Sequence, residues 1–179
     1  MEKTIDLKGF IEALVENSYR GIKTACAGLT DEQLWYQPTL ESNSMAWLAW
    51  HLSRAKDAIT AAISGETEVW VSEGWAERFG MDRQATGIGD SPEQVTAFRV
   101  SNELVFGYVD SAHRATIQRL SKITPGQFDQ PTVYVLGDSR PVWQALAGMI
   151  GDSGQHNGQI AYLRGIITGY GWRQRAGLH

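Results

Sequence analysis

The chain has 179 residues and a formal net charge of −4, with a composition ordinary for a globular protein. This length is sufficient for one domain with a full hydrophobic core. No basic run provides an electrostatic surface for nucleic acid, so we expect no nucleic-acid partner. The opening segment MEKTIDLKGF lacks the layout of a signal peptide, and no stretch approaches the roughly 18 unbroken apolar residues of a membrane helix. We therefore expect a cytoplasmic protein without membrane contact.

The first predicted helix runs from Asp6 to about Gly28, with Asp6 as its N-cap. Cys26 is the only cysteine of the chain, which excludes an internal disulfide framework, and we expect it to fill the buried face of this helix. Residues 29–43 predict a short helical turn capped by Thr30 and then a polar loop. The apolar positions of the first helix recur at helical spacing: Leu7, Phe10, Ile11, Leu14, Val15, Tyr19, Ile22 and Cys26.

A second long helix follows a polar cap at residues 42–44 and stops at Gly65. His51 lies on its apolar stripe, between Trp47 and Trp50. Taken alone, a histidine in this position is more often a hydrogen-bonded core residue than a metal ligand.

Residues 66–90 have no sustained periodicity, apart from a short helix that we expect over 72–79. We expect a long crossover connection that lies on the bundle and roofs a pocket. A capping box with a proline begins at Ser91 and predicts a third long helix that continues to Leu120. His113 lies near the apolar face of that helix, and we interpret it as a boundary histidine.

A second long connection, residues 123–140, contains one extended piece at 132–136 with no obvious strand to pair with. Asp138 or Ser139 is expected to cap a fourth helix, with Pro141 near its first position. Residues 173–179 resemble a tail. The prediction is an all-α fold: a single domain over residues 1–179 in which four helices form a bundle with long crossover connections.

The fourth helix carries two residues that a plain core helix would not contain, Asp152 and His156. They lie four positions apart, so their side chains are neighbours on one face of the helix, and that face also carries Met149 and Leu163. A carboxylate in an apolar environment needs a cation, hydrogen-bond donors or water.

Small residues form another stripe on the same helix, about 200° around from the acid–histidine face by the 100° helical step. Each interior glycine costs about 1 kcal/mol of helix propensity, which indicates close approach of another backbone. We expect a helix, a loop or a second subunit to cover this glycine stripe, which consists of Ala147, Gly151, Gly154, Gly158, Ala161, Gly165 and Gly169.

Together, His51, Asp152 and His156 form a candidate three-ligand metal site built from two facing helices. Imidazole and carboxylate ligands suit zinc, nickel or ferrous iron, and three protein ligands leave positions open for water or substrate. The alternative is a set of core polar residues satisfied by their neighbours Ser153, Gln155 and Asn157.

The stretches WLAWHLSRAKD and DSGQHNGQIAYLRGIITGYGW resemble the DinB-like (YfiT-like) superfamily of metalloenzymes. That superfamily is similar to the mycothiol-dependent maleylpyruvate isomerases and the bacillithiol transferase, which implies a four-helix bundle with a divalent metal. His51 and His156 match histidines of its motifs. Asp152 stands where many members have histidine and the isomerase branch has glutamate, so this shorter side chain is a departure from the pattern.

The resemblance implies a metal-dependent enzyme that acts on a small electrophile. It would either transfer or add a low-molecular-weight thiol to the electrophile, or isomerise the electrophile with the help of the thiol. Arg54 and Arg164 belong to the motifs and could hold the acidic groups of a substrate or thiol cofactor, while an ion-pair network with Asp57 is their structural alternative. Metal-activated hydrolysis and a non-catalytic dimeric binding or stress protein remain as other functions. We expect a homodimer that acts on a small molecule.

Overall fold

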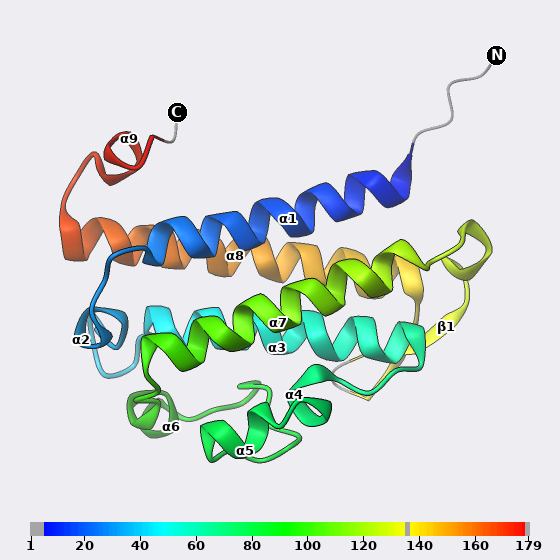
Figure 1. The fold of residues 1–179 in the computed structure, drawn as a ribbon, viewed down its shortest axis with the longest axis horizontal. Coiled ribbons are helices and arrows are strands. Elements are labelled where there is room, and N and C mark those ends of the chain that lie inside the picture. Colours follow the sequence, from blue (N-terminus) through cyan, green and yellow to red (C-terminus); the bar gives the residue numbers. More distant parts are fainter. Residues whose placement is uncertain (1–5, 135–136, 178–179) are drawn as a thin grey trace.

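The computed structural model describes residues 6–134 and 137–177 and contains a bundle of four long helices (Figure 1). These helices are α1 (Leu7–Cys26), α3 (Met45–Ser64), α7 (Asn102–Ser121) and α8 (Val142–Thr168). Helix α3 contacts α7 and α8, and α1 contacts the same two helices from the other side. Helices α1 and α8 run in one direction, and α3 and α7 run in the other (Figure 1). The predicted all-α bundle is confirmed.

Helix α1 begins as the sequence predicts, since an Asp6 carboxylate oxygen accepts a hydrogen bond from the Gly9 amide at 2.9 Å. Cys26 is buried at its C-terminal end, and burial raises the pKa of its thiol to about 12, which makes it unreactive. Leu7 and Phe10, which the apolar pattern places on the buried face, are instead exposed.

The first connection contains the short helix α2 (Asp31–Leu34). Thr30 and Gln33 form a reciprocal capping box at its start, as the polar sequence indicates. Ser44 then caps α3 by accepting from the Trp47 amide, and α3 ends before Gly65. These predicted boundaries are confirmed.

The second connection crosses the length of the bundle and carries α4 (Val69–Ser72), α5 (Trp75–Phe79) and α6 (Pro92–Ala97). The helix predicted from Ser91 to Leu120 is in fact two helices. Phe98 leaves the helical conformation at φ −70 and ψ 86, and its ring packs 5.2 Å from that of Trp50. A new cap at Ser101 starts α7, so burial of one aromatic side chain interrupts the predicted helix.

The crossover is fastened to the bundle by the carboxylate of Asp57, which is fully buried in α3. Its oxygens accept from the amides of Val69 and Trp70, at 3.0 and 2.9 Å, where α4 begins. The same carboxylate accepts from Arg119 Nη1 at 2.7 Å and from the Tyr108 hydroxyl at 3.1 Å. Asp57 therefore joins α3, α4 and α7.

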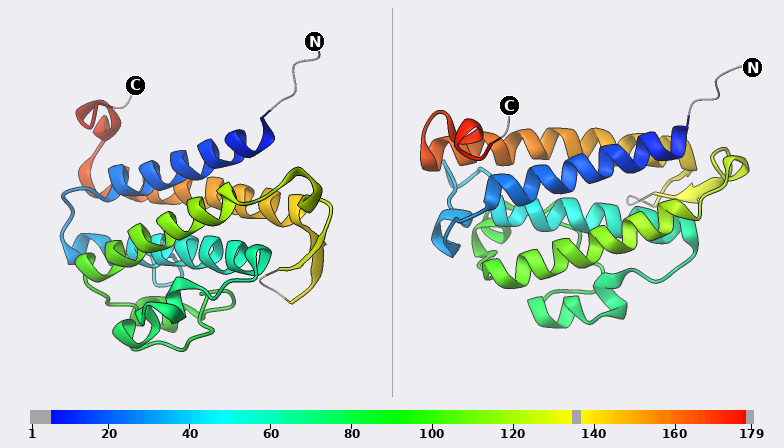
Figure 2. Two further views of the ribbon diagram at one scale, coloured as in Figure 1. Left: turned by 45° about the vertical axis from the view of Figure 1, so that its right-hand side comes forward. Right: turned by 45° about the horizontal axis from the view of Figure 1, so that its top comes forward.

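The third connection contains a short 3-10 turn, η1 (Pro125–Gln127), and a hairpin beside the ends of α3 and α8 (Figure 2). Strand β1 (Pro131–Val133) pairs antiparallel with β2 (Ser139–Pro141), in the register Pro131 to Pro141. The extended piece predicted near 132 therefore has a partner, and the part of it at 135–136 lies outside the described residues.

The predicted caps of the fourth helix, Asp138 and Ser139, are wrong. Both precede or belong to β2, and Pro141 occupies the cap position of α8. The predicted tail begins with a further short helix, α9 (Trp172–Arg175). Within the described part of the chain, no helix has the length and apolar character needed to span a membrane.

Candidate metal centre

The three predicted ligands come together at the contact between α3 and α8. His51 extends from the second turn of α3, and Asp152 and His156 extend from successive turns of α8. One ligand atom from each residue lies within 4.8 Å of the other two. His156 Nε2 is 3.2 Å from Asp152 Oδ1, and the two imidazole rings meet edge to face with centroids 5.2 Å apart.

The crossover fixes the orientation of His51. His51 Nδ1 lies 2.6 Å from the carbonyl oxygen of Thr86, so Nδ1 carries the proton and donates it. The Trp47 indole stacks on one face of the imidazole, with centroids 4.8 Å apart and planes 10° apart. The lone pair of Nε2 is therefore free for a metal.

Gly87, the residue after Thr86, closes over this imidazole. Its φ is +84, and an added Cβ would lie 2.9 Å from His51 Nδ1 and 2.8 Å from the Trp47 ring. Both the backbone conformation and the space require glycine here.

His156 is oriented by its own helix. Its Nδ1 lies 2.7 Å from the Gln159 side-chain oxygen, which can only accept, so Nδ1 is a donor. Neutral His156 would then bring a lone pair on Nε2 against the Asp152 carboxylate at 3.2 Å. That contact requires a positive charge, either a proton on Nε2 or a metal ion between the two groups. The donor set therefore fits a divalent cation.

The electrostatics of the three groups agree with this interpretation. Burial lowers the pKa of His51, and the neighbouring His156 lowers it further. The hydrogen bond with Asp152 raises the pKa of His156. Burial alone would raise the pKa of Asp152, but the hydrogen bond and charge of His156, with the charges of His51 and Lys56, outweigh it and lower that pKa. A metal would therefore displace a proton from His156 when it binds.

A buried lysine lies in the bundle interior behind this site. Lys56 Nζ donates to Ser18 Oγ at 2.7 Å, and no other hydrogen bond of that ammonium is found among the described residues. Burial lowers its pKa to about 8, and the charge of Asp152 partly opposes that change. Lys56 thus supplies a positive charge on the core side of the aspartate.

Several residues that shape the site have no signal in the sequence alone. Thr86 and Gly87 lie in a stretch without periodicity, and Gln159 is an ordinary polar residue on a helix. The Tyr134 hydroxyl also lies close to α8: a Cβ added at Gly148 would be 2.8 Å from its oxygen. The one sequence signal for this part of the site is the glycine-rich end of the crossover. Glycine permits the left-handed backbone conformation that Gly87 adopts against the His51 imidazole.

Arg54 follows His51 by three residues on α3, and its side chain contacts the crossover. Its Nε donates to the Ala85 carbonyl at 2.7 Å, and its Nη1 lies 2.6 Å from a Glu68 carboxylate oxygen. It lines a pocket of about 250 Å³ together with Thr86 and Tyr134. None of the three candidate ligands lines this pocket, and its link to them is Thr86, whose carbonyl accepts from His51.

Arg164 lies further along α8, eight residues after His156 and therefore about 12 Å away along the helix axis. Its Nη1 donates to the Ala27 carbonyl at the end of α1, at 2.9 Å. The structure thus places Arg164 at the end of the bundle, in a different pocket from Arg54.

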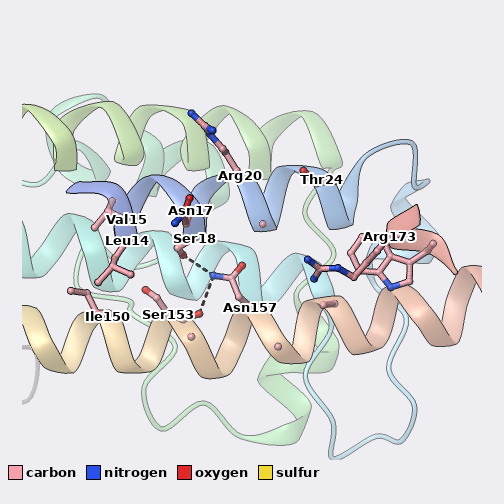
Figure 3. Close-up of a pocket in the computed structure, with 15 residues that line it drawn as sticks. Leu14, Val15, Asn17, Ser18, Arg20, Thr24, Ile150, Ser153, Asn157 and Arg173 are labelled. Carbon is pink, nitrogen blue, oxygen red and sulfur yellow. Dashed lines mark hydrogen bonds between the residues drawn. The ribbon is translucent and has the colours of Figure 1, made fainter. Parts of the chain in front are cut away.

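A groove between α1 and α8 lies on another side of α8 (Figure 3). It has a volume of about 580 Å³, and none of the three candidate ligands lines it. Asn157 crosses its floor by donating to Ser18 Oγ at 2.7 Å and to the Ser153 carbonyl at 2.9 Å (Figure 3).

Within the single chain the glycine stripe is covered only in part: Trp172 lies 3.8 Å from a Cβ built at Gly165, and cover by a second subunit stays a prediction. No atom lies within 4 Å of a Cβ built at Gly151, Gly154 or Gly158. The neighbouring helix α1 approaches one side of the stripe and leaves the groove open.

Comparison with known proteins agrees with this fold. The structure is similar to the crystal structure of a conserved protein from Enterococcus faecalis, with a TM-score of 0.78 and 20% sequence identity over 92% of this chain and 98% of that chain. A search of curated proteins gives no match. The sequence profile of the DinB superfamily matches residues 15–160, and the chain therefore belongs to the DinB superfamily.

Proposed function

We propose that this protein is a divalent-metal-dependent enzyme that transfers or adds a low-molecular-weight thiol to a small electrophile. The observation that carries the proposal is the convergence of His51, Asp152 and His156, each of which brings one potential ligand atom within 4.8 Å of the other two. Membership in the DinB superfamily, which is generally metal-dependent, supports it.

In this proposal His51, Asp152 and His156 hold zinc, nickel or ferrous iron. A bound metal would lower the pKa of a coordinated thiol, so that a thiolate nucleophile is present near neutral pH. The hydrogen bonds to Thr86 and Gln159 keep both imidazoles in the tautomer that binds metal. The Trp47 ring shields one side of the set from water.

The small pocket lined by Thr86, the residue that orients His51, is our candidate for the electrophile. Its volume of about 250 Å³ suits a small molecule, and Tyr134 and Arg54 line it. An acidic group on the substrate or thiol would compete with Glu68 for Arg54 Nη1. Arg54 therefore remains our proposed contact for such a group.

The first experiment measures metal by mass spectrometry on protein purified without chelator or affinity tag. We expect near-stoichiometric metal in the natural chain and its loss in both His156→Ala and Asp152→Ala. The matched control is Gln155→Ala, an exposed neighbour on the same helix, which should retain the metal. Metal retained in Asp152→Ala alone would remove the aspartate from the ligand set, and failure of every sample to bind metal would defeat the enzyme proposal.

Activity then separates the candidate reactions. Metal-loaded protein is mixed with an aryl halide and each common bacterial thiol, and conjugation is followed by absorbance. We expect conjugation that requires both the thiol and His51. Turnover of ester or amide substrates without thiol would instead support metal-activated hydrolysis.

We also propose that the protein is a homodimer. The glycine stripe is open at Gly151, Gly154 and Gly158 in the single chain, and Tyr162, four residues after Gly158 on the same helix, is 72% exposed. A large exposed apolar side chain beside open small residues favours a subunit contact at this face. Two copies of α8 could approach each other closely here, because Gly154 and Gly158 have no side chains to keep the backbones apart.

A further inference from the structure

A second pocket with a strongly cationic lining lies at the end of the bundle where α1 and α8 finish and α9 packs (Figure 1). Its volume is about 810 Å³. Lys23 of α1, Arg164 of α8 and Arg175 of α9 line it, and Trp172 provides an apolar wall. No carboxylate is among the described residues that line it, although the chain as a whole carries a net charge of −4.

Two of these three cations have no acidic partner among the described residues. Lys23 is paired with Asp110 at 2.8 Å. Arg164 donates from Nη1 to the Ala27 carbonyl, and Arg175 donates to the carbonyls of Tyr170 and Thr168. Neither guanidinium makes an ion pair in the part of the chain that the structure describes.

A purely structural role would be to satisfy the last carbonyls of α1 and α8, which arginines near helix C-termini often do. This role uses only some of the donors of each guanidinium, which has five N–H groups. In particular, Arg164 Nε is buried and has no hydrogen-bond partner among the described residues. A buried donor without a partner is costly, so the contact with the Ala27 carbonyl does not by itself account for this guanidinium.

We propose that this pocket binds a small organic anion whose carboxylate or phosphate is held by Arg164 and Arg175. Planar guanidinium groups match both kinds of oxyanion, and two of them in one concave pocket can hold one anion from two sides. Trp172 offers a flat surface for the apolar part of the ligand. The pocket is separate from the metal set, since Arg164 follows His156 by about two turns of α8.

The test is titration calorimetry of the full chain with inorganic phosphate and, separately, with benzoate, at low ionic strength. We expect saturable binding at one site for at least one of the two anions. Arg164→Gln and Arg175→Gln should each weaken it about tenfold or more, because each removes a charge-assisted hydrogen bond. Binding of phosphate only would identify a phosphorylated ligand, and binding of benzoate only would identify a carboxylate.

Arg83→Gln is the matched control. It removes the same charge from an exposed arginine that pairs with Glu77 in the crossover, so it should leave the titration unchanged. Arg175→Gln also removes two bonds that hold α9, and Arg164→Gln, on the long helix α8, therefore provides the independent test. The proposal is overturned if neither anion saturates the natural chain, or if Arg164→Gln binds as tightly as the natural chain.

Discussion

At the scale of single residues, the orientation of His51 depends on a segment far from it in the sequence. Its own helix directs the imidazole toward α8, but the Thr86 carbonyl decides which nitrogen is protonated. Gly87 is needed because any side chain there would overlap the imidazole and the indoles of Trp47 and Trp50. The crossover is therefore part of the candidate metal centre even though it supplies none of the three candidate ligands.

This dependence gives a prediction for Gly87→Ala. The added methyl group must displace His51 or Thr86, and loss of such an orienting contact typically weakens metal binding by about 10–100-fold. The left-handed backbone adds a cost of about 1–2 kcal/mol to folding. Competition with a chromophoric chelator measures the metal affinity, and thermal melting measures the stability.

Gly89→Ala is the matched control, since Gly89 has a φ of +82 in the same loop but no atom within 4 Å of its added Cβ. It should lose similar stability and keep its metal affinity. Equal metal affinity in the two variants would show that Gly87 does not position His51.

Lys56 gives a prediction about pH. Its pKa falls from 10.5 to about 8 because burial disfavours the ammonium ion. Between these two values the unfolded chain binds more protons than the folded chain, so the contribution of Lys56 to stability improves as the pH rises. The change amounts to about 3 kcal/mol across this window. We expect Lys56→Met to remove this part of the pH dependence in urea unfolding between pH 8 and pH 10.

Lys122→Met provides the comparison, because Lys122 is a half-exposed lysine that pairs with Glu66. Its unfolding free energy should follow the natural chain across the same pH range. If Lys56→Met also follows the natural chain, burial does not lower the pKa of Lys56 and the prediction fails.

At the scale of elements, Asp57 links three helices, and its removal should loosen the crossover more than the bundle. Asp57→Asn leaves the buried Arg119 and Arg54 without their common carboxylate, and breaking such a buried pair costs about 3–5 kcal/mol. We expect a lower urea midpoint and faster protease cleavage within residues 67–100.

Asp110→Asn is the control: it breaks the half-exposed pair with Lys23 and should cost no more than about 1 kcal/mol. Similar losses in the two variants would contradict the anchoring role.

The sequence predicts elements well where a local signal exists. Asp6, Thr30, Ser44 and Ser91 all cap helices as expected, because a side chain that accepts from an amide three residues later is a local interaction. The break after α6 could not be predicted in this way, since it depends on Phe98 packing against a ring in α3. The partner of β1 was missed for a related reason: β2 is only three residues long and precedes a helix directly.

At the scale of the whole molecule, the bundle and its ligand set follow from two apolar stripes that carry His51, Asp152 and His156. The helical period alone places these residues on inward faces, so their meeting could be predicted. Their degree of burial could not, because it depends on how far the crossover and the hairpin extend over the site. Asp152 retains 35% side-chain exposure and His156 retains 16%, which leaves the set at the edge of the core and accessible to a ligand.

The open glycine stripe yields the last prediction, which concerns assembly. If two copies of α8 meet there, an arginine at Gly158 would place a long charged side chain where two backbones approach closely. We expect Gly158→Arg to convert a dimer into a monomer in light scattering coupled to size exclusion, with the helical circular dichroism unchanged. Nothing lies within 4 Å of a Cβ at this position, so the substitution should not disturb the fold of the single chain.

Gln118→Arg is the corresponding control, because Gln118 is an exposed residue of α7, away from the stripe. It adds the same charge and should leave the dimer intact. A natural chain that is monomeric at micromolar concentration, or a Gly158→Arg variant that remains dimeric, would exclude α8 as the contact. The metal set is built within one chain, so the monomeric variant should still bind metal, and this separates assembly from the chemistry of the site.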